Sequence, residues 1–211
     1  LDLPLSAGLI YSKRTPRNIA EAFQNHTATL LSKQTDYPLI QSQMGIYAAC
    51  MSRQGEIVYN NGVLFHLGIS VDLQKLAHAC ESMVAAHPYL KTHIFLDDDG
   101  NPRQQRRDDE VYHQSIENIS ENEFEKLKPQ LIQPFDVLKD QLFRIRIFQT
   151  PNDAYLFTDF HHIIFDGLSN SLFMNDLKRA YDGQALEAEA YQAYDYALYE
   201  QQLSSTDRHA E

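Results

Sequence analysis

The residues best suited to chemistry lie in segment 161–167, where two adjacent histidines precede an aspartate and a glycine. Histidine changes its protonation near neutral pH and can therefore accept a proton from an incoming nucleophile. Asp166 follows His162 by four residues, so its carboxylate could orient the imidazole or lock the loop by pairing with a cation elsewhere. Gly167 would let the backbone turn tightly into the next helix. The segment predicts general-base catalysis by a histidine.

His161 and His162 cannot do the same work if both lie on one strand. Adjacent strand residues point to opposite faces, so one imidazole would face the core and the other a cleft or the opposite surface. A single strand histidine is usually a satisfied core residue, whereas two in tandem are costly to bury without partners, which favours a functional role. A metal site is the alternative. His162 and Asp166 would be its local ligands, with no obvious third ligand nearby.

The surrounding patterns place this segment where a strand runs into a helix. Residues 142–149 and 154–162 are strand-like and are joined by a turn at 150–153. An amphipathic helix is predicted over residues 168–181, ending at Gly183. A strand would therefore deliver the histidines, and a helix start would follow them.

The rest of the chain alternates helices with strands and hairpins. Asp72 caps the clearest helix pattern, and Ser120 forms a capping box with Glu123. Three more helices are expected: one over 16–30, one that begins after a cap at Ser42, and one over about 188–203. Two more strand-like stretches are expected, one over 57–68 with a break at Asn60-Asn61-Gly62 and one over 91–96 before a turn at 97–100. This alternation predicts an α/β (α+β) two-layer sandwich, with helices packed on one face of a sheet.

Composition narrows the class of protein. The chain has 211 residues, 43% of them hydrophobic, which is enough for one sizeable core, or one domain with a short appendage. A net charge of -11 without a Lys/Arg-rich run argues against nucleic acid. No membrane-spanning stretch or signal-peptide pattern is present, which argues against a membrane. Cys50 and Cys80 fall in apolar helical patterns and are interpreted as buried free thiols of a cytoplasmic protein, with a disulfide as the alternative.

A family resemblance sharpens the prediction. The His-His-x-x-x-Asp-Gly pattern after a strand resembles the signature of condensation domains of nonribosomal peptide synthetases, and chloramphenicol acetyltransferase shares the simpler His-x-x-x-Asp. Further segments resemble that family's motifs in the same order. They are Tyr37-Pro38-Leu39 leading to Gln43, Ala86 to Thr92, Pro134-Phe135-Asp136, and Tyr191 to Gln202. The chain departs from the family near Gly45, where an Arg is replaced, at Pro88 in place of Glu, and at Lys91 in place of Arg.

The resemblance implies a role for each residue of the segment. His162 would be the general base, or would position the attacking amine beside a thioester carbonyl, and His161 would be structural and face inward. Asp166 would be mainly architectural, held by an Arg in this family, and Lys91 could pair with it as a point charge or could be a solvated strand residue. Gly167 would lie close to the reacting centre, where a side chain would obstruct the tunnel.

The resemblance also divides the chain. Residues 1–25 are similar to the C-terminal end of a peptidyl carrier domain, residues 26–36 would be a linker, and residues 37–211 would be the N-terminal lobe of a condensation domain. That lobe is chloramphenicol-acetyltransferase-like, with helices on a mixed, largely antiparallel sheet. The chain begins without Met and stops in a charged stretch, so we expect it to be part of a longer protein that supplies the C-terminal lobe.

The implied activity is amide bond formation between a carrier-bound thioester donor and an aminoacyl acceptor amine. Upstream and downstream peptidyl carrier domains would be the partners. They would deliver substrates on phosphopantetheine arms, and no cofactor would bind the lobe directly. The lobe alone would be a poor catalyst. Three alternatives remain open: a stand-alone CoA-dependent acyltransferase, which would be a trimer, an epimerisation-type homologue, and a non-catalytic lobe that docks carriers. The substrates and stereochemical preference are not accessible from the sequence.

Overall fold

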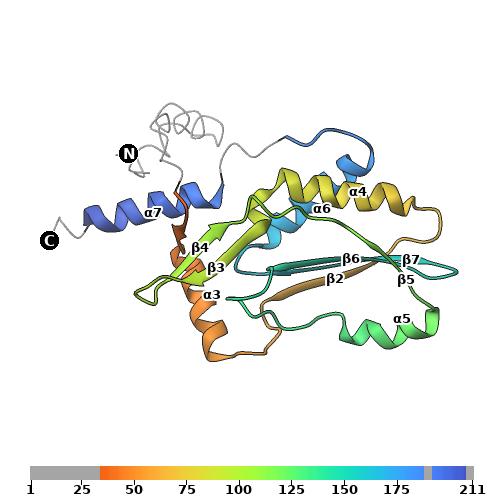
Figure 1. Ribbon diagram of the computed structural model, residues 1–211, viewed down its shortest axis with the longest axis horizontal. Coiled ribbons are helices and arrows are strands. Elements are labelled where there is room, and N and C mark those ends of the chain that lie inside the picture. The colour runs from red at the N-terminus through yellow and green to blue at the C-terminus, as the bar shows by residue number, and fades with distance from the viewer. Residues whose placement is uncertain (1–33, 188–191, 208–211) are drawn as a thin grey trace, which may run out of the picture.

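The computed structural model describes residues 34–187 and 192–207 (Figure 1). The helix expected over 16–30 and the carrier-like segment 1–25 lie outside the described residues, as does the linker up to residue 33.

A four-stranded sheet forms the centre of the molecule, in the order β2-β7-β6-β5. Its strands are β2 (Asn60–His66), β7 (Ala154–His161), β6 (Phe143–Gln149) and β5 (Ile116–Asn118). The first three pair antiparallel, and β5 pairs parallel with β6. The expected mixed, largely antiparallel arrangement is confirmed.

A second, smaller sheet stands beside the first. It has the order β1-β4-β3 and consists of β1 (Tyr37–Pro38), β4 (Pro102–Arg106) and β3 (Thr92–Leu96), all antiparallel. The sequence predicted only one sheet, because strand patterns do not indicate which strands share a sheet.

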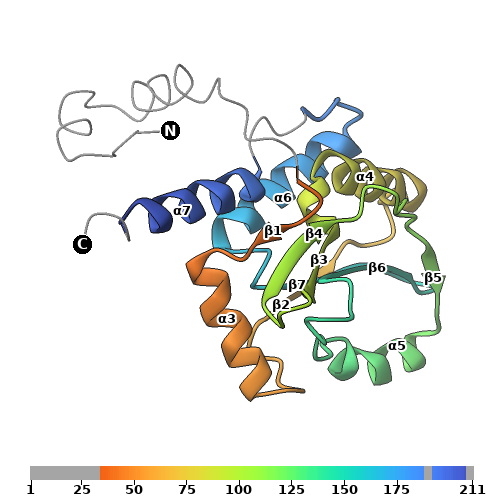
Figure 2. The same cartoon turned by 60° about the vertical axis from the view of Figure 1, so that its left-hand side comes forward.

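Helices cover both faces of the central sheet. α4 (Leu73–Ala86) and α6 (Gly167–Tyr181) pack side by side on one face, and α5 (Glu121–Leu127) lies on the other (Figure 1). α3 (Gln41–Ser52) follows β1, and α7 (Ala193–Asp207) lies beside β1 (Figure 2). Two short 3-10 helices, η1 (Pro88–Lys91) and η2 (Lys128–Gln130), complete the fold. No helix in the described ranges is long and apolar enough to cross a membrane.

Burial on both faces explains the sequence of β7. All but one of its residues are buried, because alternate side chains enter two different cores. The larger core lies under α4 and α6 and includes Phe160. The smaller core lies under α5 and consists of Phe124, Leu131, Phe148 and Phe157.

Two of the three predicted helix caps are confirmed. Asp72 accepts the backbone N–H of Lys75, and Ser120 forms the predicted capping box. The cap predicted at Ser42 is wrong, because α3 begins at Gln41.

The break predicted at Asn60-Asn61-Gly62 is also wrong, because β2 begins at Asn60 and continues through the glycine. A Cβ at Gly62 would lie 2.7 Å from the Cδ1 atom of Ile132. The glycine therefore makes room for a neighbouring segment, and it does not form a turn.

Candidate active site

The two histidines at the end of β7 lie in opposite environments. His161 is 2% exposed, whereas His162 is exposed. The backbone is held from both neighbouring strands at this point. The N–H of His161 donates to the carbonyl of Leu142, and the N–H of His162 donates to the carbonyl of Tyr59, each at 2.8 Å. The side chains therefore diverge from a fixed backbone, as strand alternation predicts.

His162 has the tautomer that a general base requires. Its Nδ1 atom lies 2.9 Å from the carbonyl oxygen of Phe165. A carbonyl oxygen only accepts hydrogen bonds, so Nδ1 carries the hydrogen, and in the neutral ring Nε2 carries the lone pair. The imidazole borders an open pocket of about 260 Å³ that Asn61 and Gly167 also line. The exposed His162 side chain can thus meet a substrate from solvent.

His161 is held as a neutral structural group. Burial lowers its pKa to about 4, with help from the neighbouring charges of His162 and Arg144. Its Nδ1 atom accepts the backbone N–H of Ile163 at 3.2 Å. The other ring nitrogen, Nε2, lies 3.6 Å from the sulfur of Cys50. At neutral pH the ring is therefore uncharged, and both of its nitrogens are engaged inside the protein.

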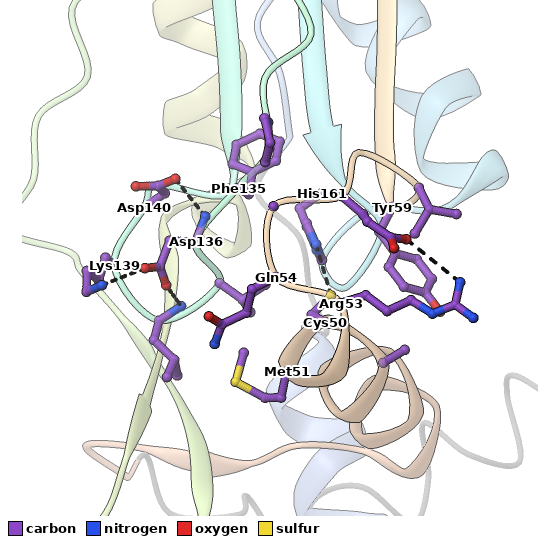
Figure 3. Close-up of a pocket in the computed structure, with 17 residues that line it drawn as sticks. Cys50, Met51, Arg53, Gln54, Tyr59, Phe135, Asp136, Lys139, Asp140 and His161 are labelled. Atoms are coloured by element: carbon purple, nitrogen blue, oxygen red, sulfur yellow. Dashed lines mark hydrogen bonds and ion pairs between the residues drawn. The ribbon is translucent and has the colours of Figure 1, made fainter.

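A second pocket, of about 400 Å³, opens on the His161 side (Figure 3). Its walls are the last turn of α3, the segment that follows it, and the loop over residues 134–140. Two ion pairs lie on these walls, Lys139 with Asp136 and Arg53 with Glu56 (Figure 3). Asp140 adds a carboxylate whose partner, Arg144, is not among the lining residues.

A buried ion pair stabilises the strand end next to His161. Asp159 is two residues earlier on β7, and its side chain is fully buried. Its Oδ2 atom accepts hydrogen bonds from the Nδ2 of Asn60 at 2.8 Å and the Nη1 of Arg144 at 3.1 Å. Burial raises the pKa of Asp159, while these two bonds and the arginine charge oppose the shift. The pair ties together β2, β6 and β7 at the end that carries the histidines.

Arg144 also holds the Pro134-Phe135-Asp136 loop against the sheet. Its guanidinium donates to the carbonyls of Gln133 and Pro134, at 2.6 and 2.9 Å. The same group lies 3.6 Å above the centre of the Phe135 ring, a cation–π contact. The Phe135 ring in turn meets His161 edge-on. One arginine thus connects the loop to the buried histidine.

Sequence reasoning missed Arg144 and Asp159, although a signal for the pair was present. The predicted hairpin turn joins Gln149 to Ala154, and in that register Arg144 stands directly opposite Asp159. Opposite charges facing each other across two strands form a stabilising pair. Extending the hairpin register along the sequence would have found them.

Asp166 is a helix cap. Its Oδ1 atom accepts the backbone N–H and the hydroxyl of Ser169, at 2.8 and 2.7 Å. These bonds, the backbone one first, lower the pKa of Asp166. Of the two alternatives for Lys91, pairing with Asp166 is not found among the described residues, because the Lys91 ammonium donates to the carbonyl of Glu110. Lys91 is also not a solvated strand residue, since it is partly buried at the end of η1. No ion pair joins Asp166 to an arginine among the residues that the structure describes.

Gly167 is the first residue of α6 and lines the pocket beside His162. It does not adopt a positive φ, so the expected tight, glycine-dependent turn is wrong. A Cβ at this position would meet no atom within 4 Å. Among the described residues, the open pocket beside His162 is the feature that a side chain at this position would affect.

The remaining metal and thiol expectations concern His162, Asp166, Cys50 and Cys80. Within residues 34–187 and 192–207, no group of three His, Cys, Asp or Glu side chains is placed to hold a metal ion. Cys50 and Cys80 are free thiols. Burial raises the pKa of both, that of Cys80 to about 12.

Comparison with known proteins gives a consistent result. Residues 33–211 match the family described as Condensation domain. The chain is 27% identical to surfactin synthase subunit 1 of Bacillus subtilis (strain 168), over 98% of the chain and 6% of that protein. It is similar to the X-domain from teicoplanin biosynthesis, solved in complex with OxyB, with 26% identity and a TM-score of 0.70 over 84% of this chain and 40% of that one.

A third relative is similar in fold. The starter condensation domain of rhizomide synthetase has 18% identity and a TM-score of 0.66, over 81% of this chain and 44% of that one. The chain therefore spans less than half of either solved relative, and a small part of the synthetase subunit.

Proposed function

The chain belongs to the condensation domain family of nonribosomal peptide synthetases, and we propose that it carries the half of the active site that supplies the general base for amide bond formation. One observation supports this best. The hydrogen bond from His162 to the Phe165 carbonyl assigns the lone pair to Nε2, and His162 lines an open pocket.

The proposed step joins an acyl or peptidyl thioester to an amine. The acceptor nitrogen attacks the thioester carbonyl carbon, so a C–N bond forms and the C–S bond breaks. Nε2 of His162 takes the amine proton, or holds the amine in line, and the proton passes to the departing thiolate. Asp166 holds the start of α6 next to the base, and His161 fixes the strand end behind it. Gly167 leaves the pocket beside the base open.

The substrates would arrive on phosphopantetheine arms of an upstream and a downstream peptidyl carrier domain. A C-terminal lobe would supply the opposite wall of the substrate tunnel, a proposal supported by the 44% coverage of the solved starter condensation domain. On this view the present chain alone catalyses condensation poorly, because neither arm is held in attack geometry. The two free thiols agree with a cytoplasmic location.

A second candidate function is recruitment of another protein without catalysis. It is favoured by the likeness to the X-domain that was solved in complex with OxyB. The two candidates differ in their need for His162, since a recruiting surface does not use a base.

The deciding experiment replaces His162 in the complete synthetase. We expect His162→Ala to lower condensation by about 100-fold or more, while the carriers remain loaded and the protein remains folded. The matched control is His78→Ala, because the His78 side chain is 82% exposed on α4. A condensation rate of His162→Ala within about twofold of the wild-type rate would show that His162 is not the base, and it would favour the recruitment function. Chiral analysis of the product separates amide formation from epimerisation.

A further inference from the structure

A buried glutamine on α3 contacts the backbone immediately after the proposed base. Gln43 is 4% exposed. Its Nε2 atom donates to the carbonyl of Ile163 at 3.0 Å, and the two residues are 120 positions apart in the chain. Ile163 follows His162 directly. Gln43 therefore reaches the backbone of the histidine loop, residues 162–166, from a different part of the fold.

The N–H of His162 donates to the carbonyl of Tyr59 where the loop leaves β7, and the loop's other hydrogen bonds to the described residues are local. Ile164 donates its N–H to the carbonyl of His161, and the Nδ1 of His162 bonds to the carbonyl of Phe165. Local bonds give the loop its internal shape, but they do not fix its position relative to the rest of the protein. Gln43 supplies such a fixed reference from α3.

The orientation of the Gln43 amide is fixed by its neighbours. Its Oε1 atom accepts the backbone N–H of Ile40 at 3.0 Å and the Nε2 of Gln104 at 3.2 Å. A flipped amide would place NH₂ against these donors and an oxygen against the Ile163 carbonyl. The NH₂ group must therefore face the loop, where the hydroxyl of Tyr89 also accepts from it at 2.8 Å.

Gln104 is the structural counterpart of Gln43. It is fully buried, and its Nε2 donates to the carbonyl of Pro38 and to Gln43. None of its hydrogen bonds to the described residues reaches the histidine loop. The two amides thus share a cluster and a degree of burial, and they differ in contact with the loop.

We propose that Gln43 is a positioning residue for His162, acting through the Ile163 carbonyl. Losing the amide NH₂ would leave a buried carbonyl unpaired, and the loop would shift to find a new partner. The Phe165 carbonyl belongs to the same loop, so such a shift would weaken the bond that fixes the His162 tautomer. A small displacement of a catalytic group can lower a rate by about 100-fold.

The first test uses the 211-residue chain and does not depend on the proposed function. Nitrogen-15 NMR of the His162 ring reports which nitrogen carries the hydrogen. We expect the Nδ1–H tautomer to dominate in wild type and in Gln104→Met, and a mixture of tautomers in Gln43→Met. A wild-type tautomer in Gln43→Met, or an equal change in both variants, would overturn the proposal. If Gln43→Met does not fold, Gln43→Glu decides, because it keeps the side-chain shape and replaces the NH₂ group with an oxygen.

The second test measures condensation in the complete synthetase and rests on the proposed function. We expect Gln43→Met to lower kcat by about 10- to 100-fold with KM within about threefold. Gln104→Met should stay within about threefold in both constants at matched folded fraction. Equal kcat losses in the two variants would reduce Gln43 to a structural role. If His162→Ala retains activity, the proposed function fails, and the NMR comparison still decides whether Gln43 positions the ring.

Discussion

The two sides of the β7 end differ in almost every physical respect, although His161 and His162 are neighbours. On the His161 side the ring is buried and neutral, and both of its nitrogens face protein atoms. On the His162 side a single backbone bond sets the tautomer, and the ring borders an open pocket. The strand therefore separates two tasks: one face stabilises the strand end, and the other presents a base.

The ion pair on the buried side should give the largest effect on stability. Arg144→Met would leave the buried Asp159 carboxylate with Asn60 as its remaining side-chain partner. Because the Arg144 side chain is 26% exposed, we expect a loss near the lower end of the range for broken buried pairs, about 3 kcal/mol of unfolding free energy. Urea denaturation measures it.

The control is Arg107→Met, which removes a 44% exposed side chain that pairs with Glu110 at 3.7 Å. It should change stability by less than about 0.5 kcal/mol. Equal losses of unfolding free energy in Arg144→Met and Arg107→Met would show that the buried ion pair stabilises the protein no more than an exposed one.

Replacing each of the two histidines with alanine should lower the stability of the protein by different amounts. His161→Ala removes a buried ring and leaves the N–H of Ile163 without its acceptor, so we expect a loss of about 2–3 kcal/mol. His162→Ala removes an exposed ring and should cost less than about 0.5 kcal/mol. Thermal and urea unfolding of both variants would test this, and a larger loss in His162→Ala than in His161→Ala would contradict it.

Lowering the pH should act through His161. Its pKa is about 4 in the folded protein against 6.5 ordinarily. Between these values the unfolded chain binds more protons, so stability is complete above about pH 6.5 and falls as the pH drops toward 4. We expect this group to contribute a loss of about 3 kcal/mol by pH 4.

The raised pKa of Asp159 acts in the opposite direction over part of the same pH range. The measurement is therefore the difference between wild type and His161→Asn, in which the His161 contribution is absent and that of Asp159 remains. Unfolding curves with the same pH slope in both proteins would show that His161 does not carry the effect.

Local features of the fold followed from the sequence. The caps at Asp72 and Ser120 depend on residues within three positions, and both are confirmed. Ser42 failed as a cap because Gln43 Oε1 accepts the N–H of Ile40, and the helix begins two residues earlier than predicted. Short-range patterns identify helix starts unless a neighbouring side chain takes over the same task.

The site was predictable only where it is continuous in the sequence. Strand alternation alone separates the environments of His161 and His162. The contact between Gln43 and Ile163 joins residues 120 positions apart, and no periodicity encodes such a pairing. The partner of Lys91 was left open for the same reason, because spacing says nothing about which distant group a flexible ammonium meets.

Asp166 should give the smallest effect, and it tests whether the exposed side contains a second catalytic group. Asp166→Ala removes the N-terminal cap of α6 and should cost about 1 kcal/mol, whereas Asp166→Asn retains an acceptor for the N–H of Ser169 and should cost a few tenths. If Asp166 only caps the helix, Asp166→Asn keeps nearly full condensation activity in the complete synthetase. A loss of about 100-fold in Asp166→Asn at unchanged stability would mean that the negative charge itself acts on His162. The exposed side would then hold a catalytic unit of two residues, His162 and Asp166. The two faces of β7 would then differ as groups of residues, with a catalytic group on one face and a stabilising group on the other.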